Sequence, residues 1–379
     1  MTQRAQLTVE AQALCLAART ELDAPTRAEL AGLLRGSIDL ERLWALAELH
    51  EVAPLVGRSV ESAGKDDVPA AWRERALRKR HVTLRANGRL AAALGDVLGA
   101  LDSAAVEAMP VKGLVLAEGL YGDIAARPCA DLDVLVRPTD LDAAGEALRA
   151  IGFRQRATPG YKALVHPFHG PAWARGAGAD QVRLELHWAL WADSEERLGT
   201  AGFWERAVDG TLSDRAIRSL SVEDTLLHLA IHRTRSALRL RWVVDVAELL
   251  RRHSDTLDWS AFVDRTDQAR GRTATWIVLS LARDLLDAPV PADVMRQLKV
   301  GQPKRAILER TCGVTALFRS AADGDVAQQP HLALRAFEED GVGRIAGTLW
   351  RSTLRPIREA LHDAGIVRAR RVAPGSRAA

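Results

Sequence analysis

Hydrophobic residues recur at helical spacing near both ends of the chain, whereas strand-like alternation is confined to its middle. Close to the N-terminus, apolar side chains follow one another every three or four residues, at Leu7, Ala11, Leu14, Ala18 and Leu22. This spacing predicts an amphipathic helix. Similar stripes predict helices over residues 40–50, 71–101, 222–238, 240–252, 259–270 and 273–286.

The middle of the chain alternates short apolar runs with glycine turns. Residues 109–112 form an apolar run that ends at Gly113, and a helix is expected over 114–121, followed by a loop to residue 130. Residues 131–136 read Asp-Leu-Asp-Val-Leu-Val, the alternation of a strand. A helix is predicted over 141–151, where Gly152 stops it, and further strands over 153–156, 162–166 and 181–188. The pattern therefore predicts an α+β fold in which a small mixed sheet is embedded between helical regions.

This organisation divides the chain into a helical N-terminal region (1–105), an α/β core (106–195), a helical C-terminal domain (196–365) and a basic tail (366–379). The net charge is +3, from 52 basic and 49 acidic residues. The tail holds four arginines and no acid, so without them the remainder carries about −1 (3 − 4). A tail of this composition is expected to be disordered. Because nucleic-acid binders usually carry their basic excess on the folded body, no nucleic-acid partner is expected.

Cysteine usage and hydropathy indicate the cellular setting. The chain has three widely scattered cysteines, which form neither a disulfide framework nor a CxxC metal motif. It shows no signal peptide, and no apolar run approaches the roughly 18 residues that cross a bilayer. A cytoplasmic protein without a membrane partner is therefore expected.

Two carboxylates share one face of the 131–136 strand. Because strand side chains alternate, Asp131 and Asp133 point to the same side while Leu132 and Val134 point to the other. Neighbouring carboxylates repel each other, and a divalent cation removes that cost. Mg²⁺ is usually held by one or two carboxylates together with substrate phosphates. The alternative, that both acids merely solvate a surface strand, is weakened by the rarity of Asp in strands.

A second polar face occurs in the 181–188 strand, where Arg183, Glu185 and His187 alternate with apolar residues. If the two strands are neighbours, Glu185 becomes a third carboxylate at one site. A two-metal centre for phosphoryl transfer requires such a cluster.

These residues follow the order of a known family. Val111-Lys112-Gly113, then Arg127, then the Asp131–Val136 strand and a helix ending at Gly152-Phe153 resemble the uncharacterised bacterial nucleotidyltransferase family of the polymerase-β superfamily. Glu185-Leu186-His187-Trp188 is similar to the strand that carries the third acid of that family. Flanking helical segments extend the resemblance over most of residues 10–290.

The resemblance implies transfer of a nucleoside monophosphate from an NTP to a hydroxyl of a small-molecule, peptide or protein acceptor. Mg²⁺ and an NTP, with ATP expected first, would be the cofactors. The implied catalytic and metal-binding residues are Asp131, Asp133 and Glu185. The implied nucleotide-binding residues are Lys112, Gly113, Arg127, His187, Arg239 and Arg241.

One departure from the superfamily pattern keeps a second function open. Many catalytic members have Gly-Ser or Gly-Gly at the turn before the helix, whereas this chain has Lys112-Gly113-Leu114 and lacks the hydroxyl that usually contacts phosphate. The alternative is a degenerate, non-catalytic protein of the same fold that binds a nucleotide or a peptide.

Two further groups of polar residues have more than one interpretation. A basic run from Arg73 to Arg89, with Glu74 as the nearest acid, is either an acceptor-binding face or a solvated helix face, and the latter is favoured. His228 and His232 lie four residues apart and are expected on one helical face. They either line the active-site cleft together with Arg239 or Arg241, or simply pack within the helical region.

Overall fold

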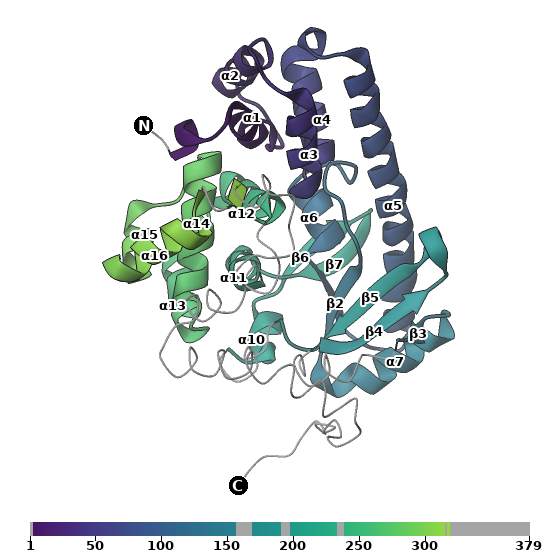
Figure 1. The fold of residues 1–379 in the computed structure, drawn as a ribbon. Coiled ribbons are helices and arrows are strands. Elements are labelled where there is room, and N and C mark those ends of the chain that lie inside the picture. Colours follow the sequence, from purple (N-terminus) through teal and green to yellow (C-terminus); the bar gives the residue numbers. More distant parts are fainter. Residues whose placement is uncertain (1–2, 157–168, 191–197, 233–238, 315–316, 319–379) are drawn as a thin grey trace, which may run out of the picture. The chain divides into compact units, whose positions relative to one another are not determined.

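The computed structural model of the protein describes residues 3–156, 169–190, 198–232, 239–314 and 317–318 (Figure 1). These residues form two compact units. The first takes in the chain up to Asn87, the segment Leu116–Pro128 and the described residues from Val222 onwards. The second takes in Gly88–Val115 and the described residues of Cys129–Ser221.

The first unit is helical. Its helices are α1 (Val9–Ala17), α2 (Ala24–Leu34), α3 (Leu40–Leu49), α4 (Ala53–Gly64), the first half of α5 (Ala70–Ser103), the end of α6 (Gly113–Gly119), α11 (Val222–His232), α12 (Leu240–His253), α13 (Trp259–Gln268), α14 (Arg272–Leu286), α15 (Ala292–Gln297) and α16 (Gln302–Cys312). Short polar side chains begin four of them by accepting a hydrogen bond from a free backbone N–H. These N-caps are Thr8, Asp23, Asp39 and Asp258.

Several basic residues of α5 pair with acids of the first unit. Arg75 pairs with Glu41 at 2.7 Å and with Glu48 at 3.7 Å, and Lys79 also pairs with Glu48, at 3.2 Å. Arg80 pairs with Asp123 at 2.8 Å. These acids come from distant parts of the sequence, so the chain order alone did not reveal them.

The second unit is built on a five-stranded sheet in the order β1-β2-β5-β4-β3. The strands are β1 (Ala108–Val111), β2 (Leu132–Val136), β3 (Arg154–Gln155), β4 (His169–Arg175) and β5 (Val182–His187). β2 and β5 are parallel, and the other neighbouring pairs are antiparallel. The sheet is therefore mixed, as the sequence predicted.

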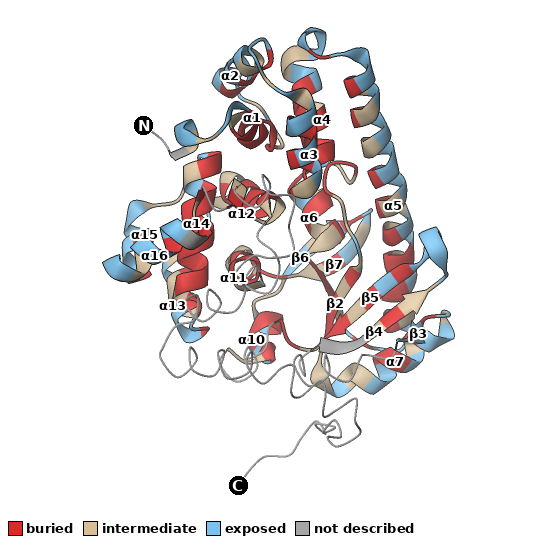
Figure 2. Ribbon diagram, viewed as in Figure 1, coloured by how far each residue is buried: buried red, intermediate tan, exposed pale blue. Residues whose placement is uncertain are grey.

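Two helices supply the apolar layer against this sheet. Leu94, Val97 and Leu101 from the second half of α5, and Leu148 from α7 (Leu141–Ala150), share one buried core with sheet residues such as Leu184. Figure 1 shows α7 and the end of α5 beside the sheet, and Figure 2 shows β2 buried along most of its length. This core fixes β2 and β5, the strands that carry the acids.

The second unit also contains α10 (Thr200–Glu205) and a hairpin that the sequence did not predict. β6 (Val208–Leu212) and β7 (Arg215–Ser219) pair antiparallel around Ser213-Asp214, both of which have positive φ. Positive φ at both central residues is the geometry of the tight hairpin turn. Only Leu212 and Ile217 of its two strands are buried, so the hydrophobic pattern was too weak to indicate strands.

The predicted fold class is confirmed, and two strand regions differ from the prediction: the β6–β7 hairpin and β4. β4 occupies His169–Arg175, where no strand was predicted. The strand predicted at 162–166 and the tail at 366–379 lie outside the described residues. Within the described parts of the chain, no helix is long and apolar enough to cross a membrane.

Candidate active site

The parallel pairing of β2 and β5 brings the predicted acids together. Asp133 stands opposite Glu185 in the register, and Leu135 stands opposite His187. Because side chains alternate along a strand, Glu185 and His187 project from the same face of β5. One ligand atom from each of Asp133, Glu185 and His187 lies within 4.8 Å of the other two. The prediction that the two acid-bearing strands are neighbours is confirmed.

Lys112 reaches this cluster from the other side of β2. It directly follows β1, whose last residue, Val111, stands opposite Asp133. Lys112 and Gly113 both have positive φ, at 57° and 36°, and this sharp turn ends the strand and begins α6. The Nζ atom of Lys112 lies 2.9 Å from Oδ1 of Asp133, and both side chains are only 9% exposed. Nε2 of His187 lies 2.7 Å from the same oxygen.

The surroundings shift the pKa values of the two aspartates, Asp131 and Asp133, in opposite directions. Burial acts to raise the pKa of Asp133, but Lys112 and the hydrogen bond from His187 outweigh it and hold the pKa well below its usual range. Asp131 lies just before β2 and is half-buried. Burial, reinforced by the charges of Asp133 and Glu185, raises the pKa of Asp131 to about 6. Three carboxylates thus crowd a site in which Lys112 offsets only part of their charge.

The donor set fits a divalent cation. Two carboxylates and an imidazole are ligands of catalytic divalent ions, and their atoms already converge. In the portion of the chain that the structure describes, this is the one group of three such side chains with converging ligand atoms. Asp131 is not a member of that group, although its charge interacts with Asp133 and Glu185.

Arg127 belongs to the first unit, where it is buried against Asp245. Its Nε and Nη2 donate to the two oxygens of Asp245, both at 2.8 Å, and the Tyr121 hydroxyl donates to Oδ1 of Asp245 at 2.7 Å. The Arg127 side chain is 3% exposed and that of Asp245 is fully buried. Sequence reasoning did not identify Asp245 as the partner of Arg127, although an acid within the apolar run Val243-Val244-Asp245-Val246 is the signal of a buried partner.

The other predicted residues of the C-terminal region also lie in the first unit. Arg241 pairs with Glu51 at 2.9 Å and donates to the Pro128 carbonyl at 3.2 Å. Arg239 pairs with Glu51 at 3.6 Å and donates to the Leu49 carbonyl. The His228 and His232 rings stack with centroids 5.5 Å apart. These contacts hold the start of α12 and its neighbours together, and the predicted roles of Arg127, Arg239 and Arg241 in nucleotide binding stay predictions.

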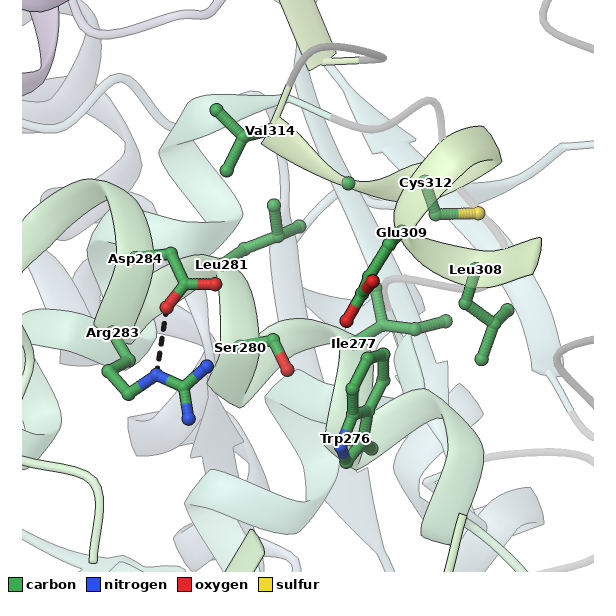
Figure 3. A pocket seen from close by; sticks show the side chains of 11 residues that line it. Trp276, Ile277, Ser280, Leu281, Arg283, Asp284, Leu308, Glu309, Cys312 and Val314 are labelled. Carbon is green, nitrogen blue, oxygen red and sulfur yellow. Dashed lines mark hydrogen bonds and ion pairs between the residues drawn. The ribbon is translucent and has the colours of Figure 1, made fainter. Parts of the chain in front are cut away.

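A small pocket occurs elsewhere in the first unit, between α14 and α16 (Figure 3). Its walls are largely apolar side chains such as Trp276, Leu281 and Leu308, with Asp284 and Glu309 beside them. None of the predicted site residues lines it.

The family follows from a comparison of the whole sequence. The family model described as "Uncharacterised nucleotidyltransferase" matches residues 36–287, two thirds of the chain. The chain belongs to this uncharacterised nucleotidyltransferase family. The matched region includes Lys112, Asp131, Asp133 and the strand that carries Glu185. No curated protein and no solved structure matches the chain.

Proposed function

We propose that this protein transfers a nucleoside monophosphate from an NTP, ATP first among them, to a hydroxyl of a small-molecule, peptide or protein acceptor. The observation that carries the proposal is the convergence of Asp133, Glu185 and His187 on two parallel strands, in a member of a nucleotidyltransferase family. Asp131 adds a third carboxylate charge at that point.

In this proposal, Asp131, Asp133 and Glu185 hold Mg²⁺. Such an ion would activate the attacking oxygen and neutralise the phosphates. Lys112 is assigned the phosphate contact, because its ammonium lies 2.9 Å from Asp133 and carries a charge opposite to that of a phosphate. Gly113 provides the positive-φ turn that aims Lys112 at the site. Nucleotide contacts from His187, Arg127, Arg239 and Arg241 rest on the family resemblance.

The reaction is an in-line displacement at the α-phosphorus. The acceptor oxygen forms a bond to that phosphorus, the bond to the bridging oxygen of the β-phosphate breaks, and pyrophosphate leaves. The hydroxyl proton is transferred to a base as the new bond forms. Glu185 is suited to face the acceptor, because its side chain is 44% exposed whereas Asp133 is nearly buried. The work of the chain is then mainly positioning and charge neutralisation.

A degenerate, non-catalytic protein that binds a nucleotide or a peptide is the second candidate. One observation favours it: the Lys112 ammonium, 2.9 Å from Asp133, is itself a countercharge for that carboxylate. A protein that no longer needed a metal would keep such an ion pair.

Substitution of the carboxylates tests the proposal. Asp131→Asn and Asp133→Asn each remove one charge at nearly unchanged shape, so Mg²⁺-dependent turnover should fall by about 10²-fold or more. Glu185→Gln should depress turnover while NTP binding stays nearly intact. Asp142→Asn, an exposed acid in α7, is the matched control and should keep full activity.

The measurement is pyrophosphate release with each NTP and Mg²⁺. Acceptors come from mass spectrometry of metabolite and peptide mixtures incubated with the protein, in search of the mass of an added nucleoside monophosphate. If Asp131→Asn and Asp133→Asn both retain full turnover, the metal assignment is wrong. Binding of NTP with no added mass on any acceptor would favour the second candidate.

A further inference from the structure

We propose that His187 is a direct ligand of the metal, and that this makes the site selective for a first-row transition ion such as Mn²⁺ over Mg²⁺. The inference rests on the proposed function in one respect, that an ion binds between Asp133 and Glu185. It adds a ligand and a metal preference that the carboxylate pattern does not contain.

The position of the imidazole carries the proposal. Nε2 of His187 lies 2.7 Å from Oδ1 of Asp133 and 3.6 Å from Oε2 of Glu185. Metal–ligand bonds of about 2.1 Å at right angles place neighbouring ligand atoms about 3 Å apart. The separation from Asp133 is close to this value and that from Glu185 is longer, so one ion could contact all three side chains after a rotamer change that brings Glu185 closer. The His187 side chain is 3% exposed, which fixes the ring in this place.

The parallel register makes the arrangement a property of the backbone. Asp133 stands beside Glu185, and His187 is the next residue on the same face of β5. The imidazole is therefore directed at the carboxylates by the strand itself. A histidine that only oriented Asp133 would not need to lie near Glu185. A histidine that binds the metal needs to lie near both carboxylates.

The ligand chemistry determines the metal preference. Mg²⁺ prefers oxygen ligands, and an imidazole nitrogen favours transition ions, whose affinity for such sites rises along the first row. To coordinate through Nε2, the ring must carry its proton on Nδ1, so metal binding replaces the hydrogen bond to Asp133 with two bonds to the ion. Mn²⁺ accepts carboxylate and imidazole together, supports phosphoryl transfer and is visible by electron paramagnetic resonance.

The test uses the full chain and Mn²⁺ without nucleotide. Free Mn²⁺ is titrated by its resonance signal, Mg²⁺ is added as competitor, and pulsed resonance detects nitrogen nuclei bonded to the ion. The wild type is compared with His187→Gln and with His81→Gln, an exposed histidine of α5. Bound Mn²⁺ should show a directly coordinated nitrogen in the wild type and in His81→Gln. In His187→Gln that nitrogen signal should be lost, and the preference for Mn²⁺ over Mg²⁺ should fall by about tenfold or more.

Each result decides a different point. Bound Mn²⁺ without a nitrogen signal, or an unchanged metal preference in His187→Gln, would show that His187 only orients Asp133 and would overturn this inference alone. Absence of any Mn²⁺ binding, in wild type and Asp133→Asn alike, would overturn the proposed metal site as well. If His187→Gln does not fold, the test uses wild-type protein grown with ¹⁵N-histidine. A histidine bonded to the ion would then change the nitrogen signal of bound Mn²⁺ relative to unlabelled protein, and an unchanged signal would refute the proposal.

Discussion

The ion pair of Arg127 and Asp245 predicts a large loss of stability on removal of a single charge. Asp245→Asn keeps the shape of the side chain, and its amide oxygen still accepts from Tyr121. It removes the countercharge that Asp245 gives to the buried guanidinium of Arg127, whose side chain is 3% exposed and directs two hydrogen bonds of 2.8 Å at Asp245.

The expected loss is about 3–5 kcal/mol in the free energy of unfolding, the range found when one partner of a buried pair is removed. The double variant Arg127→Met/Asp245→Leu removes both charges and should be more stable than Asp245→Asn. Its recovery should be incomplete, because the hydroxyl of Tyr121 loses its acceptor at a cost of about 1–3 kcal/mol.

Urea unfolding followed by circular dichroism measures these differences, and hydrogen exchange of α12 peptides locates them. Asp209→Asn is the matched control, because Asp209 forms a pair of 3.0 Å with Arg218 at 89% exposure and should leave the urea midpoint unchanged. A loss below about 1 kcal/mol for Asp245→Asn, or a double variant less stable than the single one, would refute the reasoning.

Two further predictions concern pH and packing in the first unit. Burial, with a contribution from Arg239, lowers the pKa of His50 to about 4 from 6.5. The unfolded chain then binds the proton first, so this group destabilises the fold as pH falls from about 6.5 to 4, by about 3 kcal/mol in total. The free energy of unfolding, measured across this pH range, should depend less on pH in His50→Asn than in the wild type. An equal dependence on pH in the two proteins would contradict the assignment of this effect to His50. A Cβ at Gly57 would lie 2.8 Å from Cβ of Ala76, so Gly57→Ala should destabilise by about 1–3 kcal/mol. Gly32→Ala, on an open helix face with no atom within 4 Å, should stabilise by about 0.5–1 kcal/mol, and equal melting temperatures for the two variants would refute the packing argument.

Local signals explain what the sequence predicted. The alternation in Asp131–Val136 and Gln181–Trp188 is visible without any knowledge of the partner strand, and both segments form strands of the sheet. The helices α3, α5, α12, α13 and α14 were visible for the same reason, since their apolar stripes repeat over several turns, whereas α2, α4, α15 and α16 were not predicted. β4 was missed because its sequence, His-Gly-Pro-Ala-Trp-Ala-Arg, lacks that alternation and its pairing with β5 shifts register between His169 and Ala172.

Contacts between distant residues could not be predicted. Arg127 and Asp245 are separated by 118 positions, and nothing local to Arg127 distinguishes a buried pair from a ligand contact. The direction of Lys112 towards Asp133 depends on a positive φ that is uncommon for lysine. The inclusion of His187 in the metal-binding group depends on the strand register, which the sequence does not specify until the pairing is known.

The register of β2 and β5 limits where residues can be inserted into or deleted from this sequence. Backbone hydrogen bonds between the parallel strands set the separation of Asp133 and Glu185, so this separation does not depend on the length of the chain segment that connects the strands. Residues inserted in the turn between Gly176 and Asp180 would lengthen that connection and leave the two acids side by side. One residue inserted between Leu132 and Asp133, or between Leu184 and Glu185, would turn the acid to the opposite face of the sheet. Length variation among related chains should therefore gather in the turns, and the two short strands should keep their length to the residue.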